Sequence, residues 1–344
     1  MNIIRLFKIL EKEGSLRQKQ AEKALFKDNA GSWQEVTVLP LALRSKLDKA
    51  APIEFNFDII KSIKGSNFKA AVKLEDGLSV ETVLLRHSDG RNSVCVSSQA
   101  GCPMGCAFCR TAGAGFARNL GVHEIILQVL FFSYFLKEFG AKVTNVIFMG
   151  MGEPFDNTVE VMKALNILTA DYGYAWSPYR ITVSTIGVIP GIKTFLEKTN
   201  CNLAISLHTP FHDERLQLMP IEKVYPIAKV IDELKNFDFG RQRKLSFEYI
   251  MFDKLNDTMR HATELVRLLK DLDARVNLIK FHAIPKVALR SSSEEKMIQF
   301  RDYLTDNRIV ATIRKSRGED IFAACGMLST LEKEKQSSKK NQEK

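Results

Sequence analysis

The stretch SVCVSSQAGCPMGCAFC (residues 93–109) joins a short β-branched run to three closely spaced cysteines. Further short strand-like runs follow along the chain. They are NVIFMG (145–150), RITVSTI (180–186), NLAISLH (202–208), KLSFEYIMF (244–252), RVNLIKFHAIP (275–285) and IVATIRKS (309–316). Helical stretches are predicted between them, over residues 159–168, 227–234 and 259–272. Strands that alternate with helices predict βαβ units and a parallel sheet.

About six such units fit a (β/α) barrel better than a doubly wound sheet, although both folds share the alternation. We therefore expect an α/β fold with a partial (β/α)6 barrel over residues 88–320. The barrel would place the three cysteines at the C-terminal end of its first strand, where barrels carry their active sites.

The residues before the barrel have two other patterns. Amphipathic stripes predict a small helical accessory domain over residues 1–52. FKAAVKL (68–74) and LSVETVLLR (78–86) lie on either side of Glu75-Asp76-Gly77, and Asp-Gly between two strand-like runs is a hairpin signal. We expect a β-hairpin extension over 53–87 and a C-terminal segment over 321–344, whose tail from residue 332 has almost no apolar residues and is typical of disorder.

Composition narrows the class of protein. The chain has 344 residues, 45% of them hydrophobic and 26% charged, as in ordinary globular proteins. Charges interrupt the apolar N-terminal run, so we expect no signal peptide and a cytoplasmic location. The most apolar helix, over residues 122–139, carries too many polar residues to span a membrane. The net charge of +10 favours a polyanionic partner, nucleic acid first.

The cysteines carry the strongest chemical signal. Cys102, Cys106 and Cys109 form a C-x3-C-x2-C pattern, and thiolates bind soft metals or iron–sulfur clusters. Three ligands would leave one iron of a four-iron cluster open to a substrate or cofactor. The alternative is a structural zinc ion with a fourth ligand from elsewhere, such as His123.

Polar or glycine-rich sequences end the later strands, on the same predicted rim as the cysteines. They are GMGEP (150–154), STIG (184–187), SLH (206–208) and FHA (281–283). Glycines allow a close approach of the backbone to a ligand, and a carboxylate with hydroxyls suits an amino group and a ribose. This convergence predicts a small-molecule site beside the cysteines.

Together these motifs resemble the radical S-adenosylmethionine (SAM) enzymes. Within them, CVSSQAGCPMGCAFCRTAGAGFARNL (95–120) and RKSRGEDIFAACG (314–326) are similar to the adenosine-C2 methyltransferases of 23S rRNA and tRNA, the RlmN family. The resemblance covers residues from about 15 to 328. A relative, Cfr, methylates carbon 8, and the RGED sequence at 317–320 resembles the C2 enzymes instead.

The resemblance implies a role for individual residues. The three clustered cysteines would hold a 4Fe–4S cluster. Residues at positions that contact SAM would be Gly152, Glu153, Ser184, Ser206, Leu207, His208 and His282. Cys325 would carry a methyl group taken from SAM, two SAM molecules being used per turnover. Cys95 would then release the product by attacking the Cys325 sulfur, forming a disulfide bond, and Glu81 would accept the ring proton. Cys201 matches no motif and is expected to be an inert buried thiol.

The sequence departs from the family at three positions. His282 stands where asparagine is usual, and Phe322 and Met327 replace a common aspartate and glutamine. The implied partners are 23S rRNA, tRNA, a flavodoxin-type electron donor and a thiol reductant. The chain is expected to be a monomer and to have no membrane partner. Two other readings stay open: a carbon-8 methyltransferase, and a non-catalytic RNA-binding protein with a structural metal site.

Overall fold

One mixed sheet organises the computed structural model, which describes residues 1–55, 57–63, 67–240, 243–284, 287–314, 318–323 and 326–328. Its strands in the described residues follow the order β1-β2-β3-β4-β7-β8-β9-β10-β11-β12. The antiparallel end comprises β1 (Asp58–Lys61), β2 (Phe68–Lys73) and β3 (Ser79–Arg86). The parallel part comprises β4 (Asn92–Cys95), β7 (Asn145–Phe148), β8 (Ile181–Thr185), β9 (Asn202–Ser206), β10 (Leu245–Met251), β11 (Ala274–Lys280) and β12 (Val310–Arg314).

The antiparallel end contains the predicted hairpin. Gly77 adopts a left-handed φ of +82° between β2 and β3, and the Leu78 N–H donates to the Asp76 carboxylate at 3.1 Å. Lys73 pairs with Ser79 across the turn. A short polar turn can join β2 and β3 because an antiparallel strand begins beside the end of the strand before it. The parallel strands that follow require longer crossovers.

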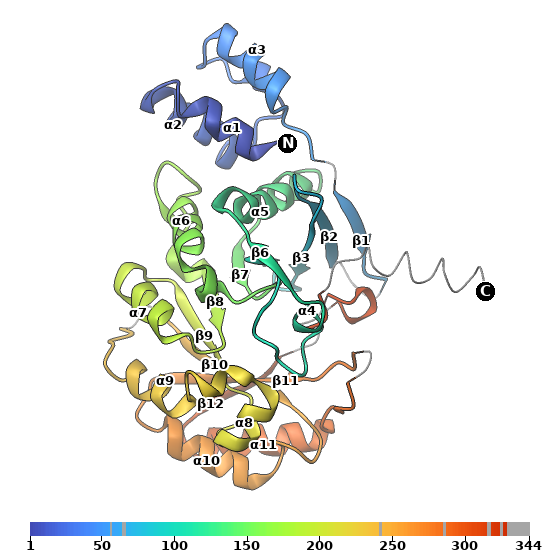
Figure 1. The fold of residues 1–344 in the computed structure, drawn as a ribbon, viewed down its shortest axis with the longest axis vertical. Helices are drawn as coiled ribbons and strands as arrows, with labels where there is room; N and C mark the ends of the chain where they lie inside the picture. The colour runs from blue at the N-terminus through green and yellow to red at the C-terminus, as the bar shows by residue number, and fades with distance from the viewer. Residues whose placement is uncertain are drawn as a thin grey trace, which may run out of the picture.

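Helices supply those crossovers along the outside of the curved sheet (Figure 1). They are α5 (Val122–Lys137), α6 (Thr158–Thr169), α7 (Ile189–Lys198), α8 (His212–Leu218), α9 (Ile227–Leu234), α10 (Met259–Leu269) and α11 (Glu294–Asp306). The short helix α4 (Arg110–Gly113) and the two-stranded sheet of β5 (Gln99–Gly101) and β6 (Phe116–Asn119) lie instead at the opening of the curve (Figure 1). The predicted α/β alternation is confirmed, and the fold is that of a partial barrel with an antiparallel extension.

The N-terminal helices α1 (Ile3–Leu10), α2 (Ser15–Phe26) and α3 (Leu41–Ala50) stand at one end of the molecule, where α1 packs against α5 (Figure 1). The Phe7 ring stacks on His123 of α5 with centroids 4.3 Å apart, and the Tyr134 hydroxyl donates to the Ala30 carbonyl at 2.9 Å. The hydrophobic core runs without a break from these helices into the sheet. This core crosses the predicted boundary at residue 52, and the division of the chain into four parts stays a prediction.

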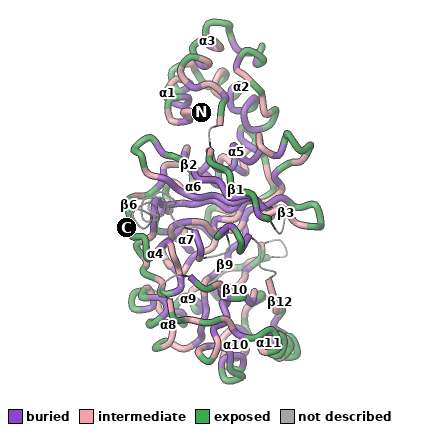
Figure 2. Tube along the Cα trace, turned by 90° about the vertical axis from the view of Figure 1, so that its right-hand side faces the viewer, coloured by how far each residue is buried: buried purple, intermediate pink, exposed green. Residues whose placement is uncertain are grey.

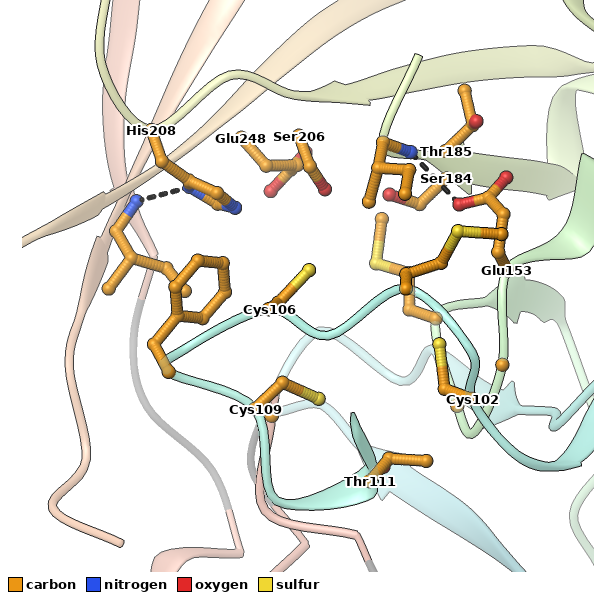
Figure 3. A pocket seen from close by; sticks show the side chains of 18 of the residues that line it. Cys102, Cys106, Cys109, Thr111, Glu153, Ser184, Thr185, Ser206, His208 and Glu248 are labelled. Atoms are coloured by element: carbon orange, nitrogen blue, oxygen red, sulfur yellow. Dashed lines mark hydrogen bonds between the residues drawn. The ribbon is translucent and has the colours of Figure 1, made fainter. Parts of the chain in front are cut away.

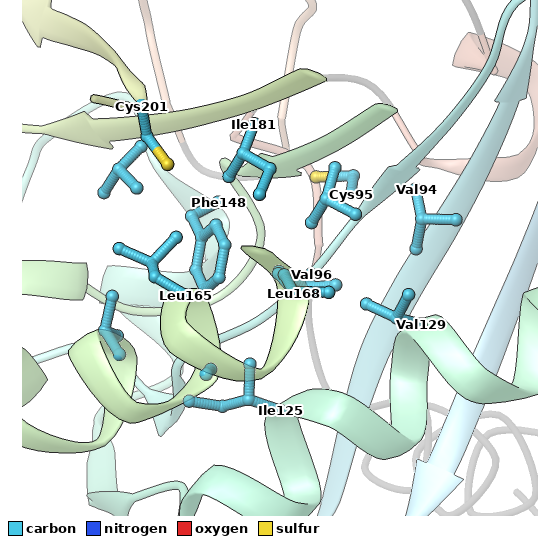
Figure 4. Packing of buried hydrophobic residues seen from close by; sticks show 14 of the residues in the cluster. Val94, Cys95, Val96, Ile125, Val129, Phe148, Leu165, Leu168, Ile181 and Cys201 are labelled. Atoms are coloured by element: carbon cyan, nitrogen blue, oxygen red, sulfur yellow. The ribbon is translucent and has the colours of Figure 1, made fainter. Parts of the chain in front are cut away.

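Buried residues concentrate along the strands, and the outer turns of the helices are exposed (Figure 2). Cys95 lies in this core beside Val94 and Val96, and Cys201 lies in it near Ile181 (Figure 4). Burial raises the pKa of the Cys201 thiol to about 12, which suits the inert role expected of it.

Several element ends differ from the predicted ones. The helix predicted to reach residue 272 ends at Leu269, because the chain must turn there to enter β11 at Ala274. The strand predicted over 275–285 ends at Lys280, after which Phe281 packs into a separate cluster with Phe108. In the part of the chain that the structure describes, no helix has the length and apolar character needed to cross a bilayer.

Candidate active site

A loop between β5 and α4 carries the three clustered cysteines. Gly101 precedes them with a φ of +83°, and a Cβ there would lie 2.0 Å from the Gly115 carbonyl, so only glycine fits. The Cys102 N–H donates to that same carbonyl at 3.0 Å, and the Ala107 N–H donates to Leu218 at 2.9 Å. The loop is therefore fastened at both ends, and its three sulfurs are directed into one space (Figure 3).

The ends of the parallel strands form the other wall of that space. Gly150, Gly152 and Glu153 follow β7, Ser184 is the second-last residue of β8, and Ser206 ends β9. All of them line the cavity with the three cysteines, as does His208. The cavity encloses about 840 Å³ of space, part of it open to solvent, which is the size range of sites for small molecules. The predicted convergence of cysteines and strand ends on one rim is present.

Glu153 is the best-defined polar group of the cavity. Its Oε1 accepts a hydrogen bond from the Phe155 N–H at 3.0 Å, and its Oε2 accepts one from the Ile186 N–H at 3.0 Å. Gly152 holds a φ of +98°, and a Cβ there would collide with Gln99 at 2.5 Å. Burial raises the pKa of Glu153 to about 7. The carboxylate is thus fixed in direction and poorly solvated, which favours a cationic ligand group.

His208 presents a neutral imidazole to the cavity. The residue adopts a left-handed φ of +61°, and its Nδ1 accepts a hydrogen bond from the Ile250 N–H at 3.0 Å. Burial lowers the pKa of His208 to about 3, so the ring proton resides on Nε2 and can be donated to a ligand. The neighbouring Leu207 is fully buried, outside the residues that line the cavity.

A polar group that the sequence analysis missed lies beside Ser206. Glu248 of β10 is paired with Ser206 in register and faces the same cavity (Figure 3). Its carboxylate accepts hydrogen bonds from Asn277 Nδ2 at 2.7 Å and from Arg314 Nη1 at 3.1 Å. The available signal was an acidic residue inside the apolar run KLSFEYIMF (244–252).

Other predicted residues lie elsewhere. His282 is outside the cavity lining, with Nδ1 3.5 Å from the Glu319 carboxylate. Glu81 of β3 is buried and forms an ion pair with Lys69 at 2.9 Å. Cys95 is buried in β4, and the Thr82 hydroxyl donates to its carbonyl at 2.8 Å. Cys325 and Arg317 lie outside the described residues.

The donor set fits an iron–sulfur cluster better than a single zinc ion. His123, the suggested fourth zinc ligand, stacks on Phe7 and is not among the residues lining the cavity, so that suggestion is wrong. Among the described residues, no three histidine, cysteine or acidic side chains are placed to hold a single metal ion. Burial raises the pKa of Cys102 to about 12 and raises that of Cys106 as well. The thiolate forms of these cysteines require a cationic centre nearby. Three thiolates that face one space suit a four-iron cluster, in which one iron would have no cysteine ligand.

Comparisons with known proteins agree with this site. Residues 96–269 match the model of the radical SAM superfamily. The chain is 46% identical to the probable dual-specificity RNA methyltransferase RlmN of Bacteroides thetaiotaomicron, covering 97% of this chain and 96% of the relative. It is 38% identical to the dual-specificity RNA methyltransferase RlmN of Syntrophus aciditrophicus, covering 91% and 90%. A solved radical SAM methyltransferase from Sphaerobacter thermophilus superimposes with a TM-score of 0.86 and 36% identity, over 95% of this chain and 97% of that one.

Proposed function

Because the chain belongs to the RlmN family of radical SAM RNA methyltransferases, we propose that it methylates carbon 2 of an adenosine in 23S rRNA and tRNA. The observation that carries the proposal is the single cavity in which three thiols face a buried carboxylate, two serine hydroxyls and a neutral histidine. A binding module with a structural metal would have no use for such a cavity.

Each group in the cavity has a task in this proposal. Cys102, Cys106 and Cys109 would hold a 4Fe–4S cluster, and Glu153 would accept hydrogen bonds from the amino group of SAM. The hydroxyls of Ser184 and Ser206 suit the hydroxyls of its ribose. Bound there, the cluster and SAM would supply the one-electron chemistry that an unactivated ring carbon requires.

Polar steps fall to the remaining residues. The Cys325 thiolate would form a bond to the methyl carbon of SAM as the sulfonium–methyl bond breaks, leaving S-adenosylhomocysteine. Glu81, whose carboxylate forms an ion pair with Lys69, would take the proton from carbon 2 of the adenine. Cys95 would attack the Cys325 sulfur to release the product. The resulting disulfide returns to two thiols with two electrons from a thiol reductant.

The proposal includes a flavodoxin-type electron donor and action as a cytoplasmic monomer. Its test is a reaction under anaerobic conditions, with reconstituted protein and with 23S rRNA and tRNA from cells that lack this gene. Digested nucleosides are then separated by mass spectrometry against 2-methyladenosine and 8-methyladenosine standards. We expect 2-methyladenosine from both RNAs and none from a Cys325→Ala variant. Formation of 8-methyladenosine, or of no methyladenosine, would contradict the proposal.

A further inference from the structure

An exposed aromatic residue near the end of the described chain has an unusual setting. Phe322 follows the short 3-10 turn Glu319–Ile321 and is 46% exposed. Its φ is +51°, a left-handed conformation that bulky side chains rarely adopt. The Arg110 guanidinium lies over its ring, with Cζ 5.4 Å from the centroid. A strained backbone thus presents an aromatic ring to solvent, with a guanidinium against it.

Phe322 and Arg110 lie beside the cysteine loop of the candidate active site. Arg110 begins α4, directly after Cys109. Its N–H donates to the Gly326 carbonyl at 2.8 Å, and Gly326 lines the cavity. The Thr111 hydroxyl donates to the Leu328 carbonyl at 2.8 Å. Residues 326–328 and the start of α4 are therefore hydrogen-bonded to each other, which places the Phe322–Arg110 pair beside the cysteine loop.

A second exposed aromatic follows the same helix. Phe116 begins β6, three residues after α4, and is 45% exposed. The charge of Arg118 in the same strand is matched, because Arg118 forms ion pairs with Asp76 and, at 2.8 Å, with Glu124. This part of the chain therefore presents aromatic surface in addition to the Arg110 guanidinium.

We propose that Phe322, backed by Arg110, is a stacking platform for a nucleobase of the RNA substrate beside the cysteine loop. The inference rests on the proposed function. An adenine that reacts inside a buried cavity must first leave its stack in the RNA, which costs free energy. Aromatic rings and arginine planes that stack on unpaired bases offset that cost.

If the Phe322 ring stacks on a base, its removal should weaken RNA binding by the same factor at every salt concentration. The probe is a fluorescent RNA hairpin with unpaired adenosines in its loop, titrated into cluster-loaded protein at several salt concentrations. Phe322→Ala should raise the Kd by about 5- to 150-fold, the range measured for loss of one stacked base. The slope of log Kd against log salt should match the wild type, because no phosphate contact is lost. Phe322→Tyr should keep the wild-type affinity, and Arg110→Lys should weaken the affinity by less than Phe322→Ala does.

Phe139→Ala is the matched control. Phe139 is 51% exposed and lies under Arg86, with Cζ 5.7 Å from the ring centroid, at the far end of α5. Its removal should leave the Kd unchanged. A hairpin whose loop nucleotides lack bases should bind wild type and Phe322→Ala alike.

Three results would overturn the platform: wild-type affinity in Phe322→Ala, a flattened salt slope in that variant, or the same loss with the abasic loop. Melting temperature and iron content identify a variant that fails to fold, in which case Phe322→Leu, which keeps the volume and removes the π face, takes its place. Failure of the proposed function would be seen separately, as wild-type protein that binds the hairpin but forms no 2-methyladenosine from either RNA.

Discussion

Replacing Arg215 should disturb the candidate active site, although Arg215 is not among the residues that line the cavity. Arg215 of α8 is fully buried. It donates hydrogen bonds to the carbonyls of Ile186 at 2.8 Å, Ser206 at 2.9 Å and Leu207 at 3.1 Å, and it forms an ion pair with Glu222. One guanidinium thus holds the C-terminal ends of both β8 and β9.

The expected loss of folding stability follows from these hydrogen-bond and ion-pair partners of Arg215. Arg215→Met leaves three carbonyls without their donor and a buried carboxylate without its cation, and losing one member of a buried pair costs about 3–5 kcal/mol. For a chain of this length that corresponds to a fall in Tm of roughly 4–7 °C. The Ile186 N–H also orients Glu153, so the affinity for SAM should fall too.

The assay is denaturant unfolding combined with calorimetric titration of SAM into the reconstituted protein. The double variant Arg215→Met with Glu222→Leu should lose less stability than the two single variants added together, because the second change removes the stranded carboxylate. Arg267→Met is the control, since Arg267 is exposed, pairs with Glu264 on its own helix, and should change stability by less than about 1 kcal/mol. A loss below about 1 kcal/mol in Arg215→Met, or additive losses in the double variant, would refute this reasoning.

Other predictions address the cluster, the thiols and pH. Replacing the three clustered cysteines by alanine should remove about four irons per chain together with activity; stoichiometric zinc in an anaerobic, iron-replete wild-type preparation would contradict the cluster. Cys95→Ala should accumulate a protein–RNA conjugate that survives denaturing electrophoresis, whereas the double variant with Cys325→Ala should form none; an inactive Cys95→Ala that never traps RNA would show its role to be wrong. His208 binds protons more weakly when folded (pKa about 3) than when unfolded, so it should cost stability progressively as pH falls below about 6.5. His208→Gln should therefore flatten the acid limb of the unfolding curve between about pH 6.5 and 3, and an unchanged limb would count against a buried neutral imidazole.

The local pattern of the sequence was sufficient for the order of elements and for much of the site. Short apolar and β-branched runs predicted the parallel strands, because the strands of a parallel sheet are largely buried and rich in such residues. Asp76-Gly77 predicted the hairpin, because the left-handed turn requires glycine. The cysteine loop and the strand-end motifs could be placed on one rim, because parallel strands all end on the same side of a sheet.

Tertiary structure alone decided which polar side chains meet. Glu248, Asn277 and Arg314 come from three strands separated by crossovers, and their contact depends on strand register, which no local pattern encodes. The same holds for Arg215, whose hydrogen bonds reach the ends of two strands from a helix behind them. Sequence periodicity indicates which face of an element is buried, but the neighbour that covers that face is set by the packing of segments distant in the chain.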